Sequence, residues 1–338
     1  MLMSPERAAD AHARIGRLVA ELRRVLLGKE ETIDEVVAAL LARGHVLLEG
    51  LPGLGKTELV KALGRLLSLD FRRIQFTPDL LPTDITGSHI LQEEGGRKHF
   101  VFHPGPVFTN LLLADEINRA SPKTQAALLE AMQERRVTTF GETRVLPDPF
   151  FVLATQNPIE LEGTYPLPEA QLDRFMFKVD VAGVERTVLE EILVSRVRGE
   201  PPLLEPMLGA GDLSELFTLV DTVHLPRPVA NYIARLVAAS HPTCAEAPEP
   251  VRTFVKYGSS PRAAIAIGAA SRGLALLRGK PNVGFDEVRR VAAPAIAHRL
   301  VLDYAGRLEG WDGRRIVGAL LDAIPEVERG LPATLDAR

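Results

Sequence analysis

The segment Gly50–Thr57, GLPGLGKT, constrains this chain more than any other. Its first glycine is followed five residues later by Gly-Lys-Thr, which matches the pattern G-x-x-x-x-G-K-[ST]. An apolar run at His45–Glu49 precedes it, and a helical pattern through Leu67 follows it. Glycines let a backbone close around phosphate oxygens, and the N–H groups of the next helical turn point at the anion. The segment therefore predicts a phosphate-binding loop between a buried strand and a helix.

The chemistry of the loop follows from its last residues. Lys56 is expected to reach the β- and γ-phosphates of a nucleotide, and the Thr57 hydroxyl is expected to ligate Mg²⁺. The residues predicted to bind the nucleotide are Gly50, Pro52, Gly53, Leu54, Gly55, Lys56, Thr57 and Glu58.

The sequence pattern differs between the two halves of the chain. Up to about Asp180, short strand-like runs alternate with helical patterns, which predicts a parallel sheet covered by helices. The further strands are expected at Arg73–Phe76, Leu111–Glu116 and Phe150–Thr155. The remainder reads as helices only. We therefore expect an α/β nucleotide-binding unit over residues 1–183 and a smaller all-helical unit over residues 184–338.

Two β-hairpins are predicted to interrupt the α/β unit. One covers about Gly87–His103 and turns at Glu93–Arg97. The other pairs 136–140 with 143–146, and its two-residue turn is expected at Gly141-Glu142, as a Gly-X turn.

Polar residues end two of the predicted strands. Asp115 and Glu116 close the third strand, where a carboxylate can hold Mg²⁺ through water and its neighbour can take a proton from an attacking water. Asn157 follows the fourth strand and could orient water or the γ-phosphate, although Asn-Pro is also a turn signal by itself. Ligands of open α/β sheets bind at this carboxyl edge.

Composition narrows the possible partners and the compartment. There are 40 Lys+Arg against 44 Asp+Glu, so no strongly basic surface for nucleic acid is expected. The single cysteine, Cys244, cannot form an internal disulfide, and no apolar run is long enough to span a membrane. These features favour a cytoplasmic protein. His89, His99 and His103 lie near one hairpin without a fourth ligand, so no metal is expected there.

Five ordered stretches resemble the MoxR family of AAA+ ATPases, a P-loop NTPase group of the helix-2-insert clade. They are Gln75–Gly87, Ala114–Ala120 with Gln125–Met132, Ala154–Pro158, Leu167–Phe175 and Gly258–Ala263. The resemblance covers nearly the whole chain, and it implies an αβα sandwich with an α-helical lid.

The resemblance also implies roles for individual residues. Asp115 and Glu116 match the Walker B acids, with Asp115 and Thr57 holding Mg²⁺, and Asn157 matches sensor 1. Arg174 matches an arginine finger that acts in trans, and Arg262 matches sensor 2 on the lid. Gln75 is implied to hold Glu116 away from water until a partner binds. For Arg119, an interface role and helix-start packing stay equally open.

The implied activity is Mg²⁺-dependent ATP hydrolysis by a homo-oligomeric ring, most simply a hexamer. Such a motor would remodel a protein client, together with a partner that carries a von Willebrand factor A domain. The alternatives are the motor subunit of a metal-chelatase complex, a nucleic-acid motor and a nucleotide-gated scaffold with negligible turnover. The balanced charge disfavours the nucleic-acid motor, although Arg97 and Lys98 lie on a hairpin tip.

Overall fold

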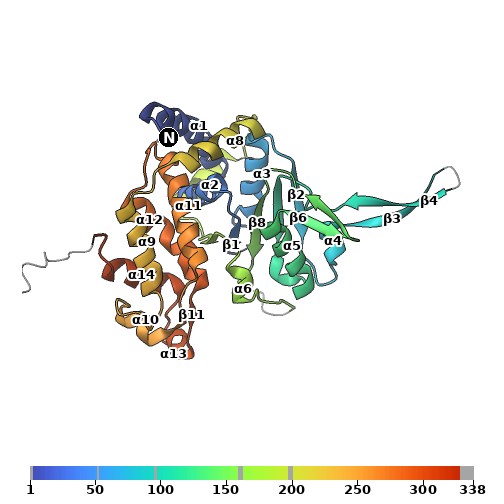
Figure 1. Cartoon of the computed structure of the whole chain (residues 1–338). Helices are drawn as coiled ribbons and strands as arrows, with labels where there is room; N and C mark the ends of the chain where they lie inside the picture. The colour runs from blue at the N-terminus through green and yellow to red at the C-terminus, as the bar shows by residue number, and fades with distance from the viewer. Residues whose placement is uncertain (1–2, 52, 95–96, 159–162, 197–200, 328–338) are drawn as a thin grey trace, which may run out of the picture.

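A parallel β-sheet lies in one half of the molecule, with helices on both of its faces (Figure 1). The computed structural model describes all residues except 1–2, 52, 95–96, 159–162, 197–200 and 328–338. Within the described residues the sheet has five strands in the order β2-β5-β8-β1-β9. Their bounds are Val46–Glu49 (β1), Phe71–Gln75 (β2), Leu111–Asp115 (β5), Phe151–Gln156 (β8) and Phe177–Asp180 (β9). The predicted α/β sandwich with a parallel sheet is confirmed.

The three central strands β5, β8 and β1 are mainly apolar because the sheet is covered on both sides. In β5, Leu111 and Leu113 face one hydrophobic cluster, whereas Leu112 and Ala114 face the other, and all four are fully buried. Strand β9 was not predicted from the sequence. Its residues Phe177 and Val179 are buried beside β1, and its polar alternate positions weaken the apolar run.

The first cluster joins the sheet to the N-terminal helices and the lid. It contains residues of α1, α2 and α3 together with most of the apolar lid residues, so these parts share one core. The second cluster lies under α4 and α5 on the other face. The helices of this half are Pro5–Val25 (α1), Glu30–Leu41 (α2), Lys56–Leu66 (α3), Pro82–Thr86 (α4), Pro122–Glu134 (α5) and Glu169–Leu172 (α6), with a 3₁₀ turn, η1, at Ile117–Arg119.

The C-terminal half is a helical lid, as predicted. Its helices are Arg186–Ser195 (α7), Ala210–Thr222 (α8), Arg227–Ala239 (α9), Glu249–Phe254 (α10), Pro261–Leu277 (α11), Phe285–Ile296 (α12), Tyr304–Leu308 (α13) and Gly313–Ala323 (α14), with a 3₁₀ turn, η2, at Ala297–Arg299. The expectation of helices only was wrong in one detail, because Val255–Tyr257 (β10) and Val301–Leu302 (β11) pair antiparallel. Both strands are too short to show a period of two. No described helix combines the length and apolarity that crossing a bilayer requires.

Both predicted hairpins are present. The first consists of Gly87–Glu94 (β3) and Arg97–Pro104 (β4), and it projects far from the body (Figure 1). The second consists of Arg136–Thr139 (β6) and Glu142–Val145 (β7) and lies near the base of the first (Figure 1).

The turn of the second hairpin lies one residue earlier than predicted. Thr139 pairs with Glu142, so the turn residues are Phe140 and Gly141 rather than Gly141 and Glu142. Both have positive φ, 52° and 80°, as a two-residue turn of type I′ requires. Positive φ is uncommon for a bulky aromatic residue, so the sequence did not indicate Phe140 as a turn residue.

A ring cluster joins the two hairpins. The His89 ring at the base of the first hairpin lies 5.3 Å from Phe102 on β4 and 4.8 Å from Phe140 at the tip of the second. The Arg144 guanidinium on β7 lies 3.9 Å from the centre of the Phe102 ring. The base of the first hairpin therefore contacts the second hairpin through side chains.

Candidate active site

A cavity of about 310 Å³ lies at the carboxyl edge of the sheet. Segments from three separate parts of the chain meet there because β1, β5 and β8 are adjacent and parallel. Its lining residues are Gly53, Gly55, Lys56, Thr57, Glu58, Asp115, Glu116 and Asn157. All of them belong to the predicted set. Of the remaining loop residues, Pro52 lies outside the described residues, and Gly50 and Leu54 are not among the lining residues.

The loop backbone has the conformation that a phosphate cradle needs. Gly53 and Gly55 have φ of 81° and 83°, in the left-handed region that favours glycine. Gly55 is the N-cap of α3, so the free N–H groups of that helix begin at the cavity. A Cβ on Gly53 would meet no atom within 4 Å, which leaves open space beside the loop.

Lys56 is held within the loop. Its Nζ donates a hydrogen bond to the Gly50 carbonyl oxygen at 2.6 Å. Burial lowers the pKa of Lys56 below its ordinary value, and the nearby carboxylates of Asp115 and Glu116 oppose that effect. The ammonium group is thus placed between the loop and the two acids.

Thr155 on β8 fixes the two acids relative to each other. Its hydroxyl donates to Asp115 Oδ1 at 2.6 Å, and its Oγ1 accepts the backbone N–H of Glu116 at 2.8 Å. Glu116 itself is left-handed, with φ 57° and ψ 50°. Sequence reasoning missed Thr155, although a hydroxyl within a buried strand is the signal that could have revealed it.

Gln75 contacts Glu116, as the resemblance implied. Its Nε2 donates to Glu116 Oε2 at 2.7 Å from the end of the neighbouring strand β2. Asn157 is 6% exposed and follows β8 directly, so its side chain enters the cavity from the strand next to β5.

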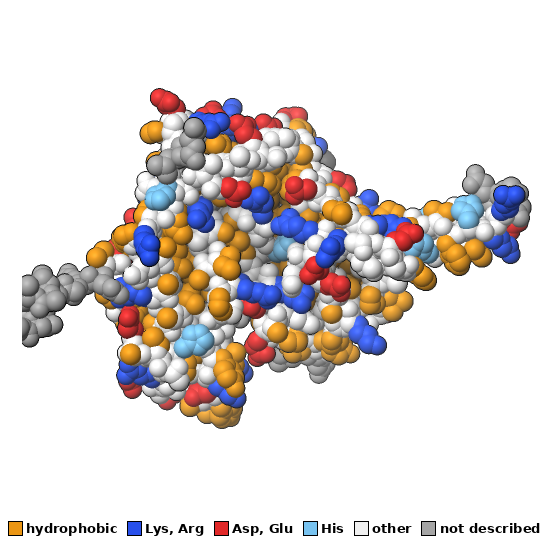
Figure 2. Space-filling model, viewed as in Figure 1, with side chains coloured by type: hydrophobic (Ala, Val, Ile, Leu, Met, Phe, Trp, Pro, Cys, Tyr) orange, Lys and Arg blue, Asp and Glu red, His pale blue; other side chains and the backbone are white. Residues whose placement is uncertain are grey.

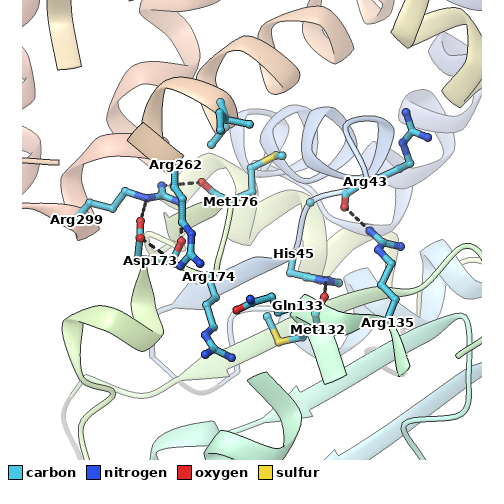
Figure 3. A pocket seen from close by; sticks show the side chains of 13 residues that line it. Arg43, His45, Met132, Gln133, Arg135, Asp173, Arg174, Met176, Arg262 and Arg299 are labelled. Atoms are coloured by element: carbon cyan, nitrogen blue, oxygen red, sulfur yellow. Dashed lines mark hydrogen bonds and ion pairs between the residues drawn. The ribbon is translucent and has the colours of Figure 1, made fainter. Parts of the chain in front are cut away.

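The two arginines predicted to be catalytic lie elsewhere. Arg174 and Arg262 line a second cavity, of about 300 Å³, together with Arg43, Arg135 and Arg299 (Figure 3). Arg174 Nη1 donates to the Leu129 carbonyl oxygen at 2.9 Å. Neither residue lines the nucleotide cavity of its own chain.

Asp173 joins the Arg174 segment to the lid. Arg262 Nη1 lies 3.4 Å from Asp173 Oδ2, and Arg299 Nε donates to Asp173 Oδ1 at 2.7 Å (Figure 3). The Ser260 hydroxyl, at the predicted N-cap of α11, donates to the same carboxylate at 3.1 Å. Burial lowers the pKa of Arg299, whereas its bond to Asp173 raises it. The sequence did not indicate Arg299 or the contacts of Asp173 with the lid, because these partners are remote in the chain.

Comparison with known proteins matches two separate parts of the chain. Residues 45–177 match a family model described as "ATPase family associated with various cellular activities (AAA)", and residues 250–319 match an AAA lid domain. The chain is 40% identical to the "Chaperone MoxR1" of Mycobacterium tuberculosis, over 98% of this chain and 89% of that protein. It is 34% identical to the "Protein MoxR" of Paracoccus denitrificans, over 93% and 96%.

Two further proteins match this chain over a similar share of its length. The uncharacterized protein YeaC of Bacillus subtilis is 42% identical, over 93% of this chain and 95% of its own length. A solved structure from Cytophaga hutchinsonii, of a protein to which ATPase activity has been ascribed, has a TM-score of 0.87 and 36% identity, over 96% and 98%. The chain therefore belongs to the MoxR family of AAA+ ATPases.

Proposed function

We propose that this protein binds ATP with Mg²⁺ and hydrolyses it. The observation that carries this proposal is the single cavity in which the left-handed loop, Lys56, both acids and Asn157 meet. The donors suit the ligand, because loop N–H groups and an ammonium bind phosphate, and a hydroxyl with a carboxylate suits Mg²⁺.

Each lining residue receives a role in this proposal. Lys56 and the loop N–H groups hold the phosphates, while Thr57 and Asp115, the latter through water, hold Mg²⁺. Glu116 accepts a proton from the attacking water, and Asn157 orients that water. Bound Mg²⁺ would neutralise negative charge on the transferred phosphoryl group.

We further propose that hydrolysis needs a neighbouring subunit. Arg174 and Arg262 line one cavity that is separate from their own nucleotide site, and the Arg262 side chain is 51% exposed. In a ring, most simply a hexamer, both would contact the nucleotide of the adjacent subunit. We therefore assign Arg262, which belongs to the lid, to the same role as Arg174, which is contact with the nucleotide of the neighbouring subunit.

The client is proposed to be a protein, as the name of the relative from Mycobacterium tuberculosis suggests. The projecting first hairpin carries exposed apolar side chains, visible in Figure 2: Ile90 is 46%, Leu91 52% and Phe100 70% exposed. Such a surface suits contact with a protein. The proposal of a partner with a von Willebrand factor A domain rests on the family resemblance. The proposal that the protein works in the cytoplasm rests on the composition.

Two substitutions test the activity. Lys56→Ala should abolish binding of a fluorescent ATP analogue, because it removes the charge that contacts the phosphates. Glu116→Gln should bind the analogue normally and lose turnover by about 10²–10⁴-fold, because only the proton acceptor is removed. Wild-type turnover in the Glu116→Gln variant would show that the assignment is wrong.

A further inference from the structure

Each acid at the end of β5 is bound by an arginine of its own chain. Arg73 Nη2 on β2 donates to Asp115 Oδ2 at 2.7 Å, and Arg119 Nη1 on η1 donates to Glu116 Oε2 at 2.8 Å. Gln75 joins the two pairs, because Arg73 Nη2 also donates to Gln75 Oε1 at 2.8 Å. Neither arginine is among the residues that line the nucleotide cavity, so both approach the acids from outside it.

Arg119 reaches Glu116 because of the local fold. The 3₁₀ turn Ile117–Arg119 follows Glu116 directly, and residues three apart in such a turn lie above one another. The backbone of Glu116 is fixed by its N–H bond to Thr155. The direction of the Glu116 carboxylate is therefore governed by its side-chain partners Gln75 and Arg119.

Both side-chain bonds to Glu116 end on the same oxygen, Oε2. A general base must come within about 2.6–3.2 Å of the water it deprotonates, with an acceptor oxygen directed at that water. These two bonds, one of them from a cation, fix the direction of the carboxylate and would have to open for Glu116 to turn toward a water.

The Arg119–Glu116 pair is weak enough to open. The Arg119 side chain is 41% exposed and that of Glu116 23%. Ion pairs exposed to this degree contribute little to stability. The pair is therefore unsuited to stabilising the fold, and a small change at the site suffices to release it.

We propose that Arg119 is a positioning residue that restrains Glu116 in the resting subunit, alongside Gln75, and so limits basal hydrolysis. This inference rests on the proposed ATPase function. It replaces both earlier readings of Arg119, interface contact and helix-start packing, with a contact to the general base of its own site.

The test measures kcat and KM for ATP, and the affinity for a fluorescent ATP analogue, in Arg119→Ala, Arg119→Lys and Lys123→Ala. Lys123 is an exposed cation on α5 and controls for loss of one positive charge nearby. Arg119→Ala should raise basal kcat several-fold, with KM, analogue affinity and melting temperature unchanged. Arg119→Lys should lie between Arg119→Ala and wild type, and Lys123→Ala should match wild type. Arg119→Ala combined with Glu116→Gln should be inactive, because the gained turnover uses Glu116.

Three outcomes would overturn the inference. Unchanged kcat in Arg119→Ala would show that the contact does not limit hydrolysis. If Arg119→Ala lost kcat and mixing with Lys56→Ala restored it, Arg119 would act on the nucleotide of the neighbouring subunit. If mixing did not restore kcat, hydrolysis at the site of the same subunit would require Arg119. Failure of the ATPase proposal is distinguishable, because wild type would then neither bind the analogue nor hydrolyse ATP.

Discussion

Glu35 on α2 is a buried carboxyl outside the nucleotide site. It is 5% exposed, and burial raises its pKa from 4.5 to about 7, with Glu31 and Asp180 adding to the effect and Arg314 and Arg290 opposing it. The pKa of Glu35 is higher in the folded state than in the unfolded state. Its contribution to the free energy of unfolding is therefore fully present below the unfolded-state pKa and is lost as the pH rises through 7. This pKa shift corresponds to about 3 kcal/mol in the free energy of unfolding. Glu35→Gln should therefore melt at a higher temperature than wild type at pH 8, and at the same temperature at pH 4.

Glu30→Gln, at an exposed position on the same helix, is the matched control and should leave the melting temperature nearly unchanged at both pH values. An equal rise for Glu35→Gln at pH 4 and pH 8 would contradict the role of ionisation.

Residues inside contiguous motifs could be predicted from sequence, but contacts between distant segments could not. The loop pattern identified Lys56 and Thr57, because their spacing alone determines that geometry. The contact of Arg262 with Asp173, 89 residues away, depends on how the lid packs against the α/β unit. No local pattern encodes this contact.

The two hairpins form one unit through Phe140, which is 84% exposed yet packs edge-on against His89. Aromatic pairs contribute about 0.5–1.5 kcal/mol, and the exposure of Phe140 favours the lower end. Phe140→Ala should increase amide hydrogen exchange of residues 87–91 and 100–104, measured by mass spectrometry, and leave basal hydrolysis within a few-fold of wild type. Val145→Ala, 77% exposed on the same hairpin, is the control. Unchanged exchange in Phe140→Ala would show that the contact between Phe140 and His89 does not couple the inserts.

Elements with a strong period or clear caps could be predicted well. Ser121-Pro122 and Ser260-Pro261 begin α5 and α11, and such starts are predictable because Ser caps and Pro at the first position act locally. Strand β9 and the turn at Phe140-Gly141 could not be predicted, because pairing with β1 and contact with His89 decide them.

The N-terminal helices and the lid are held together by close helix packing at Gly273. A Cβ there would lie 2.8 Å from the Ala38 carbonyl oxygen of α2. Gly273→Ala should therefore push α11 from α2 and destabilise the protein by roughly 1–3 kcal/mol, despite the better helix propensity of alanine. In α1, a Cβ on Gly16 would meet nothing within 4 Å, so Gly16→Ala should stabilise slightly. Thermal unfolding of both variants checks this, and a Gly273→Ala protein as stable as Gly16→Ala would contradict it.

The described residues form the proposed nucleotide cavity and, away from it, an arginine-lined cavity, and we propose that a ring brings the two together across a subunit boundary. The most direct test is to mix Arg174→Ala with Lys56→Ala, each nearly inactive alone, and to measure ATP turnover. A trans arginine is worth about 10³–10⁵ in rate in other phosphoryl-transfer systems, and each variant supplies the group that the other lacks. We predict that the mixture hydrolyses ATP well above the sum of its components. A mixture no more active than that sum, or an Arg174→Ala protein as active as wild type, would contradict the claim that two subunits share each site.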